Sequence, residues 1–147
     1  MQKTISEIIH NDMLAISKQV AGISLEEIHP AGIQDAYTLH LTAKGTYDLN
    51  LFLYADKDTL QKIADNMKRS PATETEVSIY VMEFFNILGG RIVSRINKLY
   101  QQNARFAPPK IQNCRVGVVD SHEHSFSLHY GFQDGSMEVS GDFSLIQ

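Results

Sequence analysis

Apolar side chains in the middle of the chain recur every three or four residues, which is the spacing of one face of a helix. The longest series consists of Val77, Val81, Phe84, Leu88, Ile92, Ile96 and Leu99. Just before it, Thr73 and Glu76 have the spacing of a capping box, in which two side chains satisfy backbone N–H groups at the start of a helix. We therefore expect one long helix with this apolar stripe in the core.

Two shorter helices are predicted from the same spacing. The first covers about residues 4–19, ends near Gly22 and buries Ile5, Ile9, Met13, Ile16 and Val20. Asp56 can cap the second, which extends to about Lys68 and buries Leu60, Ile63, Ala64 and Met67. Both helices are amphipathic, so each is expected to cover part of the same core.

Alternation of apolar and polar side chains predicts the strands. Residues 37–41 and 47–53 alternate and form a half-buried hairpin that turns at residues 43–46. Three more antiparallel strands are expected around Cys114, Val116 and Val118, over residues 126–132 and over residues 137–145, with a turn at 134–135. Residues 23–33 contain Pro30 and predict an irregular or edge strand, because proline cannot donate to a central ladder.

The order of elements is helix and strands, a short helix, then a long helix and strands. This is a weak structural repeat without repetition of sequence. It predicts an α/β protein of the α+β class, with a mixed sheet of about six strands and the helices packed on it. The length of 147 residues fits a single domain spanning residues 1–147.

Composition narrows the class of protein. The hydrophobic content of 43% and charged content of 20% are ordinary for a globular chain. The net charge of −4 argues against a general nucleic-acid binder, which needs a basic surface. The amino terminus lacks the apolar region of a signal peptide, and no run of about 18 apolar residues predicts a membrane span. We therefore expect a cytoplasmic protein that binds neither membrane nor nucleic acid.

A polar pair interrupts the long helix on a face away from the stripe. Glu83 and Asn86 are three residues apart, so their side chains are neighbours on the helix surface. Burying either group without a partner is unfavourable, so the pair is exposed or is satisfied by something outside the helix. Gly89 and Gly90 follow, and glycines inside a helix indicate that a backbone or a protein approaches closely.

These residues resemble the signature of the CheC/CheX family, phosphatases that dephosphorylate the chemotaxis response regulator CheY. The family pattern has Glu-x-x-Asn, a proline after a 22-residue gap, which Pro109 matches here, and an Asp or Ser four residues before the Glu. That last position departs from the pattern, because it is Ile79. The resemblance covers nearly the whole chain, implies a CheC-like fold and is closer to CheX than to CheC.

The resemblance implies a function. The chain would hydrolyse the aspartyl phosphate of a CheY-type response regulator, with Asn86 positioning water and Glu83 pairing with the regulator's active-site lysine. Gly89, Gly90 and Pro109 would contact the partner. Magnesium would belong to the regulator, so no cofactor is expected in this chain. CheX-like proteins form homodimers by strand pairing, and a homodimer is expected here. The alternative is a non-catalytic CheX-like adaptor or dimerisation domain, which the departure at Ile79 favours.

Two other groups of residues are candidate sites. Glu7 and His10 repeat the Glu-x-x-Asn outline with histidine, which resembles a degenerate first copy of the duplicated CheC motif. We interpret His10 as a partly exposed helix residue and His40 as a solvated strand residue. Residues 120–124 read Asp-Ser-His-Glu-His, with His129 further on. We interpret these histidines as a solvated turn and predict no metal site, because no third ligand has the spacing of a metal motif.

Overall fold

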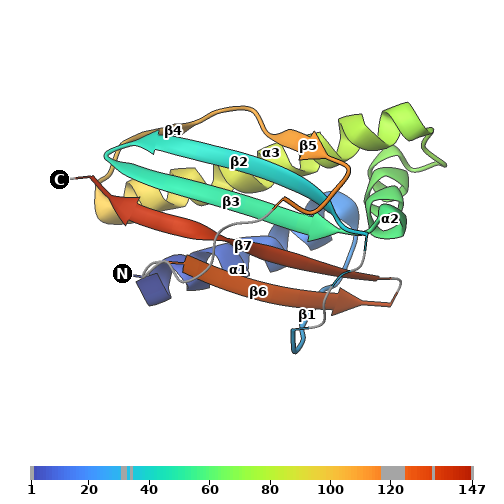
Figure 1. Cartoon of the computed structure of the whole chain (residues 1–147), viewed down its shortest axis with the longest axis horizontal. Coiled ribbons are helices and arrows are strands. Elements are labelled where there is room, and N and C mark those ends of the chain that lie inside the picture. The colour runs from blue at the N-terminus through green and yellow to red at the C-terminus, as the bar shows by residue number, and fades with distance from the viewer. Residues whose placement is uncertain (1, 31–32, 34, 117–124, 134, 147) are drawn as a thin grey trace.

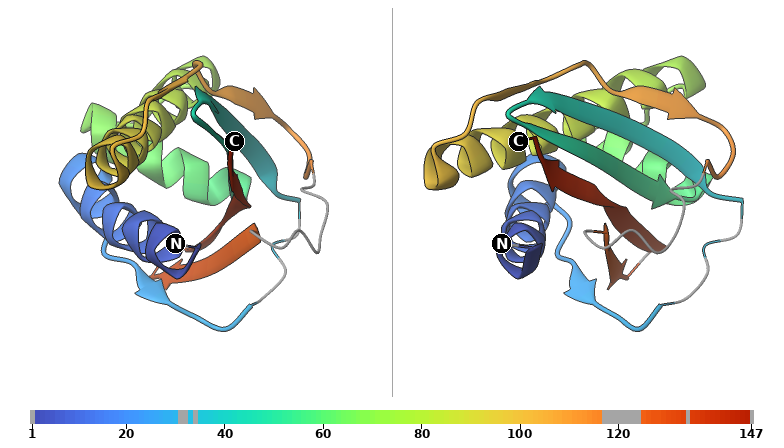
Figure 2. Two further views of the ribbon diagram at one scale, coloured as in Figure 1. Left: turned by 90° about the vertical axis from the view of Figure 1, so that its left-hand side faces the viewer. Right: turned by 60° about the vertical axis from the view of Figure 1, so that its left-hand side comes forward.

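The three-dimensional structure is a computed structural model, and it describes residues 2–30, 33, 35–116, 125–133 and 135–146. Over these residues, three helices lie on one side of a curved seven-stranded sheet (Figures 1 and 2). The helices are α1 (Gln2–Ala21), α2 (Lys57–Lys68) and α3 (Glu74–Tyr100). The strands are β1 (Glu26–Glu27), β2 (Tyr37–Gly45), β3 (Tyr47–Ala55), β4 (Ala104–Phe106), β5 (Lys110–Gln112), β6 (Ser125–Phe132) and β7 (Gly135–Leu145).

The strands follow the order β1-β6-β7-β3-β2-β4, and β5 also pairs with β2. Every pairing between described strands is antiparallel, so the predicted mixed sheet was wrong in that detail and the predicted α+β class was right. The predicted hairpin is the β2–β3 pair, in which Leu39 lies opposite Leu53. Leu53 lies opposite Val139 of β7 in turn, so one apolar row crosses the centre of the sheet.

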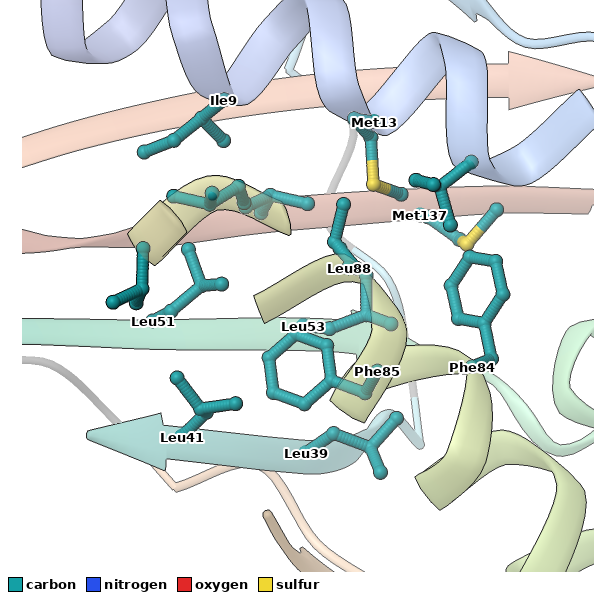
Figure 3. Packing of buried hydrophobic residues seen from close by; sticks show 14 of the residues in the cluster. Ile9, Met13, Leu39, Leu41, Leu51, Leu53, Phe84, Phe85, Leu88 and Met137 are labelled. Carbon is teal, nitrogen blue, oxygen red and sulfur yellow. The ribbon is translucent and has the colours of Figure 1, made fainter. Parts of the chain in front are cut away.

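The core lies between the inner face of the sheet and the three helices. Leu39, Leu51 and Leu53 of the sheet and Phe84, Phe85 and Leu88 of α3 are all fully buried there. Figure 3 shows Phe84 pointing toward Met137 and Met13, and Phe85 toward the leucines of β2 and β3. The apolar stripes of all three helices therefore meet on the same side of the sheet, as the sequence predicts.

The ends of α3 agree with local signals. Thr73 accepts a hydrogen bond from the backbone of Glu76, and the Glu76 carboxylate accepts one from the backbone of Thr73, which completes the capping box. Leu99 was predicted to be in the core, but it is 59% exposed in the last turn. By length and composition α3 could cross a bilayer; however, its apolar stripe packs on the sheet.

The segment after α3 differs most from its prediction. Cys114 is exposed and lies in no strand, and Val118 lies outside the described residues. The chain instead forms two three-residue strands, β4 and β5, on the edge of β2. Within the predicted irregular segment 23–33, the described strand is the two-residue β1. These strands are too short to show alternation, so periodicity alone could not reveal them.

The outer face of the sheet carries polar and aromatic side chains. The His40 ring stacks on Phe52 with centroids 4.1 Å apart, and its Nε2 lies 3.2 Å from the amide oxygen of Asn50. Arg115 lies over the ring of Tyr54 and pairs with Glu138 at 2.8 Å. His40 is therefore packed on its neighbours and only partly solvated.

Candidate functional site

Glu83 and Asn86 project from the same side of α3. Their neighbours Phe84 and Phe85 both point into the core. A helix turns by about 100° per residue, so Glu83 and Asn86 lie about 150° to either side of the core direction. The two side chains are therefore only about 60° apart around the helix axis, on its outward face.

Neither side chain of the pair bonds to another described residue of the protein. Glu83 is exposed and Asn86 is half-buried. No hydrogen bond or ion pair joins either of them to another residue in the part of the chain that the structure describes. A carboxylate and a carboxamide therefore stand side by side at the surface with their hydrogen-bonding capacity available to a partner.

Ile79 lies one turn before Glu83 on the same face and is 62% exposed. An apolar side chain this open is uncommon on a core helix, although a single one needs no special explanation. It therefore adds one exposed apolar side chain beside the polar pair.

The two glycines have different neighbours. Gly89 is buried, and a methyl group there would collide with the side chain of Leu41 in β2. The close approach that Gly89 allows is therefore to its own sheet, which does not fit the partner contact predicted for it. Gly90 is half-exposed, and a Cβ atom there would lie 3.2 Å from the ring of Phe106 in β4. Gly90 stays at the surface, next to the pair.

Asn97 follows Asn86 by 11 residues, about three turns, on nearly the same side of α3, but its side chain bonds to other parts of the protein. Its amide donates to the carbonyl of Ala104 at 3.0 Å and accepts from the backbone N–H of Ala104 at 3.2 Å. The Tyr47 hydroxyl also donates to Asn97, at 2.9 Å. Burial of this hydroxyl raises the pKa of Tyr47 to about 12, so it remains a donor at neutral pH. Asn97 thus fastens β4 to α3.

The proline segment lies between β4 and β5, along α3 (Figure 1). Pro109 is buried, while Ala107 and Pro108 are exposed. The backbone of Ala107 is held by a hydrogen bond of 3.0 Å to the carbonyl of Thr42. A partner at this surface would meet Pro108 directly, whereas Pro109 would act by fixing the segment from beneath.

The metal interpretation of residues 120–124 falls outside the described residues. Within the described ranges, no three His, Cys, Asp or Glu side chains are grouped as metal ligands. His129 lies 3.1 Å from the hydroxyl of Ser127 and 3.9 Å from the carboxylate of Glu138, on the outer face of the sheet.

The sequence did not predict the contacts of His10. Its Nδ1 lies 2.8 Å from the Tyr130 hydroxyl and 3.3 Å from the Glu27 carboxylate. Burial, followed by the charge of Glu27, raises the pKa of Tyr130. The position that aligns with Asn86 in the first half of the chain therefore joins α1 to the sheet, and no local pattern could have linked residues 120 positions apart.

Solved structures with the same arrangement include chemotaxis proteins. A Vibrio vulnificus CheX is 16% identical, with a TM-score of 0.79 over 96% of this chain and 99% of that chain. A CheC-like protein of Shewanella oneidensis MR-1 is 11% identical, with a TM-score of 0.76 over 98% and 100%. The CheX of a Borrelia burgdorferi complex of CheX, CheY, BeF3 and Mg is 13% identical, with a TM-score of 0.76 over 94% and 96%.

The fold and the exposed Glu-x-x-Asn helix thus define a CheC-like α+β protein. A family model described as chemotaxis phosphatase CheX matches residues 37–130, which is more than half of the chain. The chain belongs to the CheX family, as its motif suggested. Comparison with curated protein sequences gave no match.

Proposed function

We propose that this protein hydrolyses the aspartyl phosphate of a CheY-type response regulator, in chemotaxis or a related two-component pathway. The observation that carries the proposal is the outward projection of Glu83 and Asn86, both without internal partners, in a chain of the CheX family. A pair fixed by two buried phenylalanines can enter the phosphorylated pocket of another protein without rearrangement of α3.

The chemistry needs little from this chain beyond positioning. An aspartyl phosphate is a reactive acyl phosphate, and hydrolysis requires a water molecule in line with the leaving carboxylate oxygen. The carboxamide of Asn86 can accept a hydrogen bond from that water and donate one to a phosphoryl oxygen. The products are inorganic phosphate and the free aspartate of the regulator.

Glu83 supplies a charge for the encounter. Its carboxylate is exposed and unpaired among the described residues, so it can form an ion pair with the regulator's active-site lysine. This ion pair forms only across the interface, and it fixes the orientation of the bound regulator. Magnesium, in this proposal, is bound by the regulator and neutralises part of the phosphoryl charge.

Replacement of Asn86 tests the catalytic role. We expect Asn86→Ala to fold normally and to reduce phosphate release from a phosphorylated CheY-type regulator about 100-fold or more, because the water loses its positioning group. The matched control is Asn11→Ala, at an exposed asparagine of α1. The measurement is the rate of phosphate release above the regulator's own rate. Full activity in Asn86→Ala would reject the role.

Replacement of Glu83 tests docking. Glu83→Ala should mainly raise the concentration of phosphorylated regulator that gives half-maximal rate, because an interfacial ion pair is lost. Glu7→Ala, at an exposed glutamate of α1, is the matched control and should behave like the wild type. An unchanged half-saturation for Glu83→Ala would remove Glu83 from the interface.

The second candidate function is a non-catalytic CheX-like adaptor that binds a regulator without hydrolysing its phosphate. It is favoured by Ile79, which places an exposed apolar side chain where the family pattern has Asp or Ser. The same phosphate-release assay separates the two, because an adaptor binds the regulator and leaves its dephosphorylation rate unchanged.

We further propose a cytoplasmic homodimer formed by strand pairing. Along β6, the described part of the chain supplies only the two-residue strand β1, which pairs at Tyr130 and Gly131. On the side away from β7, β6 has no strand partner from Phe126 to Leu128 among the described residues, and such an edge favours pairing with a second copy. Molar mass from light scattering tests this: the mass of one chain would contradict the dimer.

A further inference from the structure

A groove begins at Gly90, one helical turn after Asn86, and continues toward the end of α3. It has a volume of about 530 Å³ and lies between the second half of α3 and β4. We call it the α3–β4 groove. It is lined by Gly90, Val93, Ser94, Asn97, Lys98, Ala104, Arg105 and Phe106. Because Asn97 bonds both backbone groups of Ala104, the two sides of the groove are fixed relative to each other.

The groove begins beside the pair. Gly90 comes one helical turn after Asn86, which corresponds to about 6 Å along the axis. Lys98, at the far end, is about 18 Å from Asn86 on the same measure. A standard protein interface covers about 800 Å² on each partner, roughly 30 Å across. A regulator centred on Glu83 and Asn86 would therefore reach about 15 Å along α3, over the groove from Gly90 to Ser94, and Lys98 would lie at the rim of the contact.

The charge on the groove is opposite to that of the chain. Lys98 and Arg105 are both exposed, and neither has an ion pair with a residue that the structure describes. Lys44 lies directly opposite Arg105 in the β2–β4 pairing and is also exposed and unpaired among these residues. Like charges opposite each other in a sheet are unfavourable, yet they occur here in a chain of net charge −4. Asp48 lies opposite Lys44 in the β2–β3 pairing and offsets part of this repulsion, and an acidic partner would offset more of it.

The sides of the groove combine this charge with an apolar surface. The Phe106 ring lies against Gly90, where the absence of a side chain leaves the ring half-exposed. Ser94, on the helix side, is small and exposed. The opening is therefore wide enough for an inserted side chain, with cations close by.

We propose that the α3–β4 groove binds an acidic surface segment of the same phosphorylated response regulator, beside the pocket that Glu83 and Asn86 enter. This inference rests on the proposed function. It extends that function from the catalytic pair to the residues that determine binding specificity for the regulator. Lys98 and Arg105 attract the acidic segment, and Phe106 contacts one of its apolar side chains. The groove selects the regulator and takes no part in hydrolysis.

Charge reversal tests the electrostatic part. The probe is a CheY-type regulator activated with beryllium fluoride and magnesium, titrated against the full chain by fluorescence or calorimetry. We expect Lys98→Glu/Arg105→Glu to weaken binding about tenfold and to reduce its weakening by salt, because exposed charges act mainly through the encounter. Lys18→Glu is the matched control, since Lys18 is exposed at the end of α1 and lies outside the groove.

Filling the groove tests the contact itself. Ser94→Trp places a large ring in the opening at an exposed helix position, so we expect the fold to be retained and binding to weaken about tenfold, without change in maximal phosphate release. Lys18→Trp controls for an added surface ring. Urea midpoints are compared for all variants, because Lys98 lies in the last turn of α3, where a positive charge also favours the helix.

The outcomes separate this inference from the proposed function. If the wild type releases phosphate and Asn86→Ala does not, while the groove variants bind like the wild type, the groove inference is wrong and the proposed function stands. If the groove variants bind weakly and Asn86→Ala releases phosphate normally, the groove inference stands. The proposed catalytic role of Asn86 is then rejected. If the wild type neither binds the activated regulator nor releases its phosphate, both are rejected.

Discussion

Asn97 and Asn86 lie on one face of α3 but differ in their hydrogen bonds. They are 11 positions apart, about three turns, and lie on nearly the same side of α3. The side-chain amide of Asn97 donates one hydrogen bond to the backbone of Ala104 in β4 and accepts another from it. The side chain of Asn86 bonds to no described residue, so its amide is available to a partner. Position along the helix, and not residue type, therefore decides which asparagine is available for the proposed site.

The two adjacent glycines predict a difference in stability. A methyl group at Gly89 collides with Leu41, which is buried and can move only by disturbing the core. We expect Gly89→Ala to destabilise the fold by about 1–3 kcal/mol, as overpacking does, despite the better helix propensity of alanine. At Gly90 the neighbour is the half-exposed Phe106 ring, which can shift, so Gly90→Ala should be close to neutral. Urea unfolding measures both; equal stabilities would contradict this account.

Elements with local signals were the ones that the sequence predicted well. Thr73 and Glu76 are three residues apart, and they cap α3 as expected. Asp56 caps α2 through the backbone of Thr59, at 2.8 Å, which also agrees with prediction. Each cap involves only residues within one helical turn, so the local sequence is enough to predict it.

Elements that depend on distant partners were predicted poorly. β4 and β5 have three residues each and exist because the edge of β2 is available to them. Cys114 alternates with apolar residues, yet its carbonyl accepts a hydrogen bond from Thr38 on the outer face of the sheet. For the site, the motif could place Glu83 and Asn86, but the burial of Gly89 and Pro109 required the packed sheet.

The start of α3 predicts a dependence of stability on acid. The hydrogen bond from Lys68, at 2.7 Å, and then the backbone of Thr73 lower the pKa of Glu76 to about 2, from an ordinary value near 4.5. A carboxyl group with a lowered pKa in the folded state stabilises the fold above its unfolded pKa. This contribution disappears as the pH falls from about 4.5 to about 2.

Glu76→Gln removes that dependence. We expect its urea midpoint to be lower than that of the wild type at pH 7, and the difference to shrink as the pH falls from 5 toward 2. The control is Glu74→Gln, at an exposed carboxylate in the same first turn, which has no ion pair with a described residue. A constant difference between Glu76→Gln and wild type across this range would contradict the assignment.

On the scale of the whole molecule, the helix layer keeps α3 in a fixed rotation on the sheet. α3 contacts α1, α2 and the sheet. These contacts fix which side of the helix is buried, and therefore which side faces outward. An error of one residue in this rotation would turn Glu83 by about 100° toward its neighbours. The position of the proposed site therefore depends on how firmly α1 and α3 are joined.

The pair of Asp12 and Arg95 joins these two helices. The Asp12 side chain is only 2% exposed, and Arg95 donates to its two oxygens at 3.0 and 3.3 Å. We expect Arg95→Met to destabilise the fold by about 3 kcal/mol, because it leaves a buried carboxylate without its cation. The double variant Asp12→Leu/Arg95→Met should recover much of this loss, since no unpaired charge remains. The measurement is the free energy of unfolding in urea for both variants. If Arg95→Met alone were as stable as the wild type, the ion pair would not be what holds α1 against α3.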